Sequence, residues 1–152
     1  MAFVFTLRAL LRVREIHEAA ELQQLQTLAA QTNAVRAEIE AFDAAKAELR
    51  RNVGLYSAAG LTGAELHFQL HAESARARRR KELGIKLQEL EKAFAAQQIR
   101  FLDARQQREV LSTLRDQQLA AFELEQSRRA QQRLDELFLM RRIPARQNPE
   151  SI

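Results

Sequence analysis

The chain has 152 residues, and Ala, Leu, Arg, Glu and Gln make up about two thirds of it, a composition typical of long helices and coiled coils. Four glycines, two prolines and no cysteine argue against many-stranded sheets and exclude a disulfide framework, a thiolate zinc site and a Cys nucleophile. The net charge of +4, from 24 cations and 20 anions, favours acidic partners weakly and does not by itself indicate nucleic acid.

The first predicted element is a long helix over about residues 5–57, in which proline is absent and Gly54 is the only glycine. Thr6 is placed to cap its start. Alternating steps of three and four residues from Val4 to Tyr56 meet sixteen positions, of which eleven are apolar. A 3.5-residue period over that length predicts a coiled-coil helix. The polar positions nearest its start are Arg14, Glu18 and Glu21.

Gly54, Gly60 and Gly63 form a glycine cluster that predicts a reversal of the chain at about residues 58–63. Thr62 or Gly63 is expected to begin the next helix. A single coiled-coil domain over residues 1–143 is then completed by a second helix over about 64–142.

In the second helix the three-four rhythm runs from Leu83 to Leu111 and then loses its phase. Beyond that point two registers compete, one carried by Leu114, Ala121 and Leu124 and the other by Leu119 and Phe122. Prolines end the helix, and residues 144–152 are predicted to form a disordered tail.

Neither helix can bury its apolar positions alone, so the sequence predicts an all-α fold, a long antiparallel two-helix coiled-coil hairpin. With a tight turn near Gly60 the numbers of facing residues add to about 120, and with a wide elbow near residue 72 they add to about 145. The tight turn is favoured because the loss of phase after Leu111 suits a helix that has outrun its partner.

The tight-turn register also predicts individual neighbours. Val35 is expected to face Ile85, and Leu28 to lie near Phe94. Charged side chains inside the interface fix the register of a coiled coil more than they stabilise it. Those expected here are Glu18 and Glu21, opposite Leu102 and Ile99, with Arg100 and Arg105 as their cations.

His67 and His71 stand four residues apart, the spacing of a helix-borne metal pair, but the glutamate of zinc hydrolases is missing between them. No metal or other cofactor is therefore predicted. The sequence also lacks a phosphate-cradling loop and a Ser–His–Asp set, and a two-helix rod offers no water-excluding cleft. We therefore predict a protein that is not an enzyme and has no small-molecule substrate.

The densest basic run of the chain lies just after the two histidines. It consists of Arg76, Arg78, Arg79, Arg80 and Lys81. It predicts either a contact with phosphates or an acidic protein, or a solvated helix face with Glu73 and Glu82 as local partners. Aromatic residues that would stack on single-stranded nucleic acid are not interleaved with it, so nucleic acid is not the expected partner.

The two ends of the chain carry longer residue patterns. The first is Phe3-x-Phe5-x-Leu7-x-x-Leu10-Leu11-x-x-Arg14-Glu15. The second is the stretch RQQREVLSTL from Arg105, followed by Glu125-x-x-Arg128-x-x-Gln131-x-x-Leu134-Asp135-Glu136-Leu137. Together with the length, the position of the glycine cluster and the long second helix, these patterns resemble the flagellar export protein FliJ family over about residues 3–142. Injectisome stalk proteins are the nearest relatives in architecture.

The resemblance implies a non-enzymatic coiled coil similar to the central stalk of rotary ATPases, with a role in flagellum biogenesis and type III protein export. It implies three partners: the flagellar export ATPase hexamer, the cytoplasmic domain of the export gate, and export chaperones. The implied location is cytoplasmic, peripheral at the cytoplasmic face of the inner membrane through the export apparatus. In keeping with this, the apolar opening MAFVFTL is too short for a secretory signal and no stretch is long enough to span a bilayer.

Two partner surfaces follow as hypotheses. The end of the rod that holds both termini is expected to bind the ATPase through Phe3, Phe5, Arg8, Arg12, Arg14, Arg128, Arg129, Arg133, Arg141 and Arg142. The alternative is that these arginines are solvated or paired with Glu15, Glu125, Asp135 and Glu136. The end with the turn is expected to bind the export gate through Phe42, Leu49, Leu55, Phe68 and Leu70. A different interpretation of the whole chain is a generic coiled-coil adaptor that binds anionic polymers through the basic run.

Overall fold

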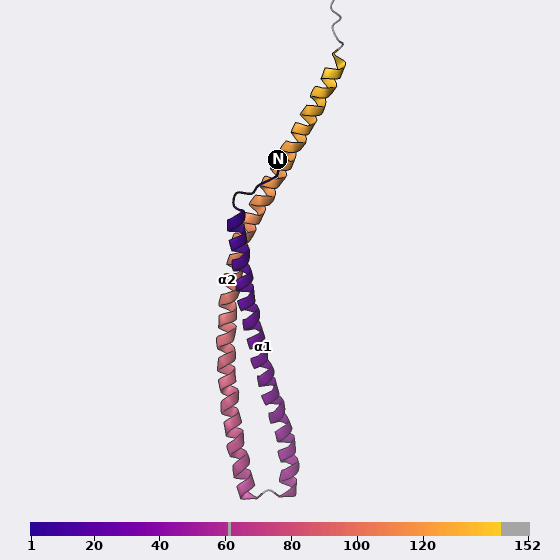
Figure 1. The fold of residues 1–152 in the computed structure, drawn as a ribbon. Coiled ribbons are helices and arrows are strands. Elements are labelled where there is room, and N and C mark those ends of the chain that lie inside the picture. The colour runs from indigo at the N-terminus through magenta and orange to yellow at the C-terminus, as the bar shows by residue number, and fades with distance from the viewer. Residues whose placement is uncertain (61, 144–152) are drawn as a thin grey trace, which may run out of the picture.

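The computed structural model describes residues 1–60 and 62–143, which form two long helices joined by a short turn. Helix α1 spans Arg8–Ala59 and helix α2 spans Gly63–Arg142, so at ~1.5 Å per residue they are ~78 Å and ~120 Å long. Figure 1 shows the two helices side by side and antiparallel. The predicted all-α helical hairpin is therefore confirmed. The tail expected at 144–152 lies outside the described residues.

The turn is built by a glycine and a capping threonine. Gly60 ends α1 with φ of +84°, a left-handed conformation that glycine adopts without steric cost. Thr62 precedes α2, where its hydroxyl accepts a hydrogen bond from the Glu65 amide at 3.4 Å and its own amide donates to the Glu65 carboxylate at 3.2 Å. This reciprocal pair is a capping box, and it identifies Gly63 as the first residue of α2.

The start of α1 differs from the prediction. Thr6 does not cap the helix. The residue that directly precedes α1 is Leu7, whose side chain makes no capping hydrogen bond. The first amides are satisfied by the backbone instead, with Arg8 N–H donating to the Phe5 carbonyl at 3.2 Å and Leu11 N–H to the Leu7 carbonyl at 2.9 Å. Residues 1–7, which we call the strap, therefore leave the helix and can run along α2.

The interface between the helices, here called the seam, follows the predicted three-four positions. From Leu11 to Val53 these positions of α1 are buried or half-buried, with Lys46 as the exception. On α2 the same holds for every predicted position from Leu83 to Leu111. The best-buried apolar section consists of Val35, Ile39 and Leu83, with Phe42, Leu87 and Leu90 packed against it.

Ion pairs across the seam establish its register. Arg36 contacts Glu91 at 3.0 Å, Arg80 contacts Asp43 at 3.1 Å, and Arg108 contacts Glu18 at 2.6 Å. The numbers of these partners add to about 125, close to the tight-turn value and far from that of a wide elbow. The tight turn is therefore the correct alternative.

One of the predicted apolar neighbours needs correction. Ile85 is 51% exposed, and Leu83 takes its place against Val35 and Ile39. Residues two positions apart on a helix point to nearly opposite sides. Leu83 shares the phase of the other seam residues of α2, whereas Ile85 faces outward. The sum of two facing residue numbers gives only the position of a residue along the rod. The helical phase decides which side of the helix that residue faces.

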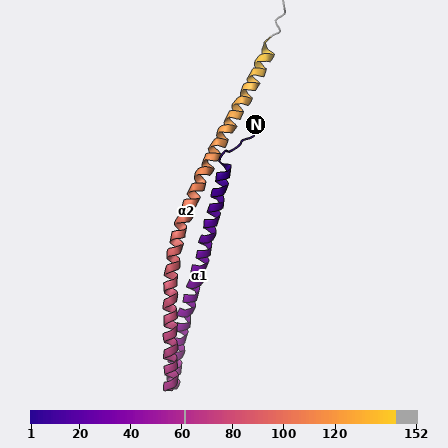
Figure 2. The same cartoon turned by 60° about the vertical axis from the view of Figure 1, so that its left-hand side comes forward.

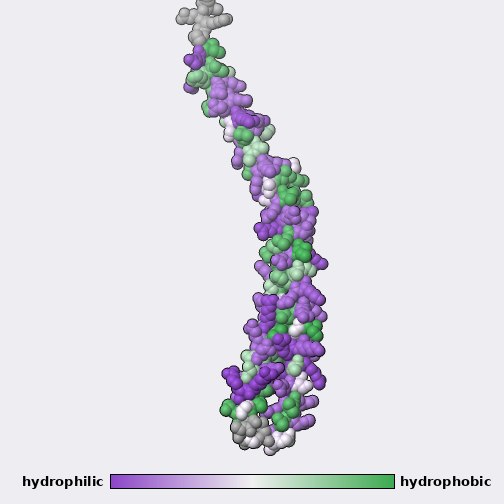
Figure 3. All heavy atoms as spheres, turned by 180° about the vertical axis from the view of Figure 1, so that it is seen from behind, coloured by the Kyte–Doolittle hydropathy of each residue, from purple (hydrophilic) through white to green (hydrophobic). Residues whose placement is uncertain are grey.

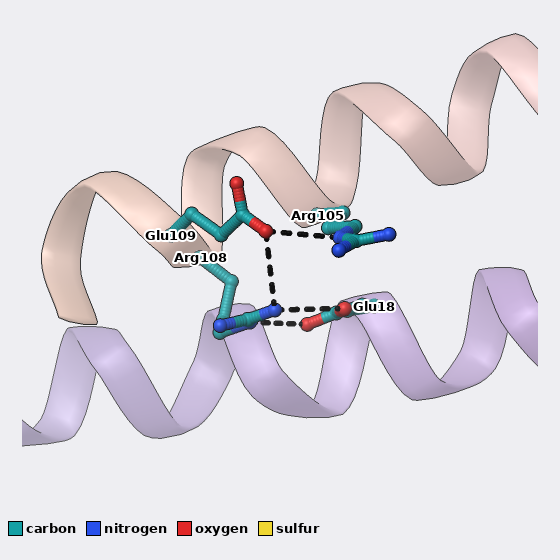
Figure 4. Close-up of polar contacts among 4 residues, drawn as sticks. All are labelled: Glu18, Arg105, Arg108 and Glu109. Atoms are coloured by element: carbon teal, nitrogen blue, oxygen red, sulfur yellow. Dashed lines mark hydrogen bonds and ion pairs between the residues drawn. The ribbon is translucent and has the colours of Figure 1, made fainter. Parts of the chain in front are cut away.

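The part of the seam around Glu18 and Glu21, here called the polar section, also differs from the prediction in its side-chain pairings. Ile99 and Leu102 are exposed, and the cation that meets Glu18 is Arg108, through a two-point contact at 2.6 and 3.2 Å (Figure 4). Arg105 instead pairs with Glu109 at 2.9 Å. Arg100 forms no ion pair with a described residue.

Two glutamines and Arg14 complete this polar section. Gln97 is 5% exposed and donates to the backbone carbonyl of Glu21 at 3.1 Å and also to the Glu21 carboxylate. Arg14 donates to the side-chain oxygen of Gln107 at 2.6 Å. Buried polar groups are tolerated when they are paired, and in the described residues no buried side-chain polar atom lacks a partner.

Beyond Leu111 the seam follows the register of Leu119 and Phe122, which are half-buried. In the competing register Leu114 is half-buried as well, but Ala121 and Leu124 are exposed. The helix α2 does outrun its partner, as expected, but later than Leu111: because the strap extends the contact, α2 continues alone only after Gln126. Phe3 packs on Phe122 with ring centroids 5.7 Å apart. An eleven-residue step from Leu111 to Phe122 relaxes the left-handed supercoil, which suits a change from a helical to a non-helical partner.

Prediction for the polar section: Glu18→Gln should lower stability by roughly 1 kcal/mol near neutral pH, because it weakens the least exposed interhelical ion pair. Arg108 lowers the pKa of Glu18 below its ordinary value near 4.5 by hydrogen bonding and charge. The stabilisation is therefore complete above about pH 4.5 and is lost as the pH falls through the lowered pKa.

Thermal unfolding followed by circular dichroism across pH 3–7 would measure the difference between wild type and Glu18→Gln. The matched control is Glu91→Gln, whose partner Arg36 and own carboxylate are both about half exposed, and which should change stability by at most a few tenths of a kcal/mol. A difference for Glu18→Gln that does not shrink in acid would contradict the prediction.

Candidate functional site

At the end of the rod that holds the termini, α2 continues as a single helix. Gln126 is its last half-buried residue, and residues 127–142, which we call the overhang, are all exposed. Figures 1 and 2 show this part of α2 extending past the start of α1 in both views. At ~1.5 Å per residue the overhang is ~24 Å long.

The overhang presents large apolar side chains to solvent. Their exposed fractions lie between 57% and 68%. They are Leu134, Leu137, Phe138, Leu139 and Met140. Single exposed apolar residues are normal on a surface, but a run of five on one unpaired helix indicates a contact surface.

The five arginines expected at this end from α2 lie in or next to these apolar residues. Arg129 pairs with Glu125 at 3.0 Å, and the Arg142 guanidinium lies 5.9 Å from the centre of the Phe138 ring. Arg128, Arg133 and Arg141 are exposed and form no ion pair with another described residue. The overhang therefore combines apolar groups with cations that remain available.

The strap and the start of α1 contribute less to this surface than the sequence suggested. Phe5 is only 6% exposed, and Phe3 is half-buried against Phe122. Arg14 is engaged with Gln107 inside the seam. Of the five expected residues from this part of the chain, Arg8 and Arg12 are the two that lie exposed on α1.

At the opposite end of the rod the two helices separate toward the turn (Figure 1). Between them lie two adjacent hollows of about 110 and 620 Å³ that share Leu49 and Arg76. The smaller is also lined by Phe42 and the larger by Phe68. In the space-filling view the helices stand apart at this end, with apolar and charged side chains intermingled (Figure 3).

The residues expected to bind the export gate divide into two groups. Phe42 and Leu49 are half-buried at the edges of the hollows. Leu55, Phe68 and Leu70 are 73%, 74% and 57% exposed. Phe68 is the one among these three that lines a hollow, so the structure joins Phe42, Leu49 and Phe68 into one region and leaves the other two beside it.

The cations of the basic run also fall into two groups, those in ion pairs and those without one. Arg79 contacts Glu38 at 3.6 Å and Glu82 at 3.5 Å, and Arg80 contacts Asp43. Both arginines therefore contact acidic residues of α1. The other cations, Arg76, Arg78 and Lys81, are exposed and form no ion pair with a described residue.

His67 and His71 are both exposed on α2. Within residues 1–60 and 62–143, no three His, Cys, Asp or Glu side chains lie together as a metal site would require. In the same part of the chain, neither helix has the length and apolar character needed to cross a membrane.

Sequence reasoning missed the partners in the polar section, although it placed the residues correctly along α2. Gln97 and Arg108 both occupy predicted seam positions, and a polar residue at such a position signals a polar partner on the facing helix. The prediction instead chose cations by register sum alone. It also missed Phe122 as the anchor of the strap, because the partner of Phe122 comes from outside any helix.

Comparison of the chain with known protein families, with curated proteins and with solved structures finds no match. The assignment of function therefore depends on the sequence patterns and on the surfaces described above.

Prediction for the strap: Phe5→Ala should destabilise the protein by roughly 2–4 kcal/mol, because it removes a buried ring from the seam. Phe138→Ala, at a position that is 62% exposed, should change stability by less than about 0.5 kcal/mol. Urea unfolding followed by circular dichroism would compare the two. Equal stabilities of the two variants would show that Phe5 is not held in the seam.

Proposed function

We propose that the protein is the non-enzymatic stalk of a flagellar type III export apparatus, which couples the export ATPase hexamer to the export gate and promotes ATPase assembly and protein export. The sequence patterns at both ends of the chain suggest this role. The structural observation that carries the proposal is the overhang, a single helix that extends beyond the coil with uncovered apolar residues and unpaired arginines.

The shape and charge of the overhang suit insertion into a ring. One helix with its side chains is ~10–12 Å wide, about half the width of the paired section. Leu134, Leu137 and Phe138 offer apolar contact area, and Arg128 and Arg133 offer charge to an acidic or carbonyl-lined lumen. A narrow tip on a stiff two-helix shaft is the form a central stalk requires.

The turn end is the part of the rod we assign to the export gate. It offers the hollows lined by Phe42, Leu49 and Phe68 and, beside them, the exposed Leu55 and Leu70. Export chaperones are the third proposed partner, with no residues assigned to them. Through these partners the protein would work in the cytoplasm at the inner face of the membrane, without contacting lipid itself.

Prediction for the ATPase contact: the double variant Arg128→Glu with Arg133→Glu should weaken binding to the cognate export ATPase by roughly tenfold or more, because both charges face an acidic or carbonyl lining. Titration into the ATPase, with the hydrolysis rate and co-elution from a sizing column as readouts, would measure this. Wild type should co-elute and raise the rate.

The matched control is Arg78→Glu with Arg100→Glu, which reverses two exposed arginines away from the terminal end. It should bind and stimulate as wild type does. Equal loss in both double variants would indicate a general charge effect, and unchanged binding of the overhang variant would contradict the assignment of the ATPase surface.

Prediction for the gate contact: Phe68→Ser with Leu70→Ser should reduce binding to the cytoplasmic domain of the gate by roughly tenfold, since each removes exposed apolar contact area. The circular dichroism spectrum should be unchanged because both side chains are more than half exposed. Surface plasmon resonance would measure the affinity. A loss of helix content instead would show that these residues stabilise the fold.

A generic coiled-coil adaptor is the second candidate function. The observation in its favour is that Arg76, Arg78 and Lys81 form no ion pair with a described residue. Such an adaptor would hold anionic polymers through the basic run, with the steep salt dependence of phosphate contacts. It leaves the apolar side chains of the overhang without a role, which is why we place it second.

A further inference from the structure

A second apolar stripe runs along α1, on the side that faces away from the seam. Three-four steps that begin at Ala9 meet eleven positions up to Ala44, of which nine are apolar, and all eleven are exposed. A 3.5-residue period is the pattern of a coiled-coil contact, and α2 does not cover this one. The stripe, here called the outer stripe, consists of Ala9, Val13, Ile16, Ala20, Gln23, Thr27, Ala30, Ala34, Ala37, Ala41 and Ala44.

The two halves of the outer stripe differ in the size of their side chains. Val13 and Ile16, which are 59% and 62% exposed, lie near its start, and from Ala30 onward every member is alanine. The distance between packed helices depends on the side chains between them. In a parallel pair of stripes large would meet large and small would meet small, so the helices could not keep one distance. An antiparallel copy of the stripe sets large against small along its length.

The order of the steps determines how two antiparallel copies align. In such a pair the residues that begin a three-residue step face those that end one. Facing residue numbers that add to 50 meet this condition along the stripe. Val13 then faces the partner's Ala37. Ile16 faces the partner's Ala34 in the same way.

The two polar members of the outer stripe select this alignment. Gln23 faces the partner's Thr27, whereas a shift by one heptad in either direction sets both of them against apolar residues. The Thr27 hydroxyl donates to the Gln23 carbonyl of its own helix at 3.0 Å. Its oxygen can therefore accept a hydrogen bond from the amide of the partner's Gln23.

Charged residues beside the outer stripe match the same alignment. Arg12 and Glu40 lie on one flank of it, are exposed, and form no ion pair with a described residue. In the antiparallel pair Arg12 lies beside the partner's Glu40, and by symmetry the contact occurs twice. A parallel pair would set Arg12 against Arg12 and Glu40 against Glu40. Charge complementarity therefore also selects an antiparallel second copy.

The remaining flank residues present no opposing charge. Ala19, Gln26 and Asn33 lie between Arg12 and Glu40 on the first flank. The second flank carries Leu10, His17, Gln24, Gln31 and Glu38. Its one carboxylate, that of Glu38, contacts Arg79 of the same chain at 3.6 Å.

The surface is also long enough for a stable contact. From Ala9 to Ala44 it extends ~50 Å along α1. The outer stripe and its two flanks supply about twenty residues, and stable protein interfaces of standard size use about 20–30 residues a side. A second copy of the chain can therefore bind through this surface alone.

We propose that the outer stripe of α1 binds the outer stripe of a second copy, antiparallel and in the alignment in which Arg12 meets the partner's Glu40. The product is a symmetric dimer with the two α1 helices in contact and the two overhangs pointing in opposite directions. The inference goes beyond the proposed function and does not depend on it.

Introduced cysteines test the alignment, because the chain has none of its own. Ala20 faces the partner's Ala30 in the proposed dimer. Full-length Ala20→Cys and Ala30→Cys chains, mixed and oxidised, should therefore form a disulfide-linked dimer on a non-reducing gel. Each variant alone should stay monomeric, since its two cysteines would lie ~15 Å apart, beyond the reach of a disulfide.

Charge reversal tests the choice of partner. Glu40→Arg should weaken dimerisation roughly tenfold in sedimentation equilibrium, because both ion pairs become repulsive contacts. Adding Arg12→Glu to the same chain should restore the affinity. The matched control is Arg100→Glu with Glu123→Arg, which reverses two exposed residues of α2 and should dimerise as wild type does. Circular dichroism should show unchanged helix content in all variants.

Four results would overturn the proposal. They are a wild-type chain that stays monomeric at every concentration, a disulfide formed by Ala20→Cys with itself, a Glu40→Arg chain that dimerises as wild type does, and an equal loss of affinity in the control. None of these results bears on the ATPase contact of the overhang, which is measured separately with the ATPase present.

Discussion

The single seam between α1 and α2 is the constraint on which every other feature of this rod depends. Two helices have no second layer to compensate for a poor contact, so each seam position must be apolar or properly paired. The section around Glu18, Gln97 and Arg108 meets that condition by pairing charge with charge and amide with carbonyl (Figure 4). Its apolar neighbours on either side stabilise the coil, and the polar section makes any other alignment leave buried groups unpaired.

The candidate functional surfaces lie where the seam stops being a good two-helix interface. At one end α1 has ended, and the overhang keeps its apolar residues uncovered. At the other end the helices move apart, and two hollows lie between them. The seam is thus best closed in its middle, and both ends leave large apolar side chains exposed.

The strap changes how the terminal end is composed. The sequence pattern predicts that Phe3 and Phe5 bind a partner protein. In the structure Phe5 is buried and Phe3 packs on Phe122. These rings extend the seam beyond the first turn of α1 and so support the base of the overhang. The exposed surface at this end consequently comes mainly from α2, with Arg8 and Arg12 added from α1.

The sequence by itself determined the class of fold, the two helices, the tight turn and the seam positions, because a 3.5-residue period and a capped glycine turn are local properties of the chain. Only the tertiary structure decided that Leu83 and not Ile85 meets Val35, that Arg108 meets Glu18, and that the strap binds Phe122. Leu83 and Arg108 already stood at predicted seam positions, so spacing gave the side of the helix that each faces. Which facing residue each one meets depends on the exact offset of the two helices and on how far a long side chain reaches, and residue spacing contains neither.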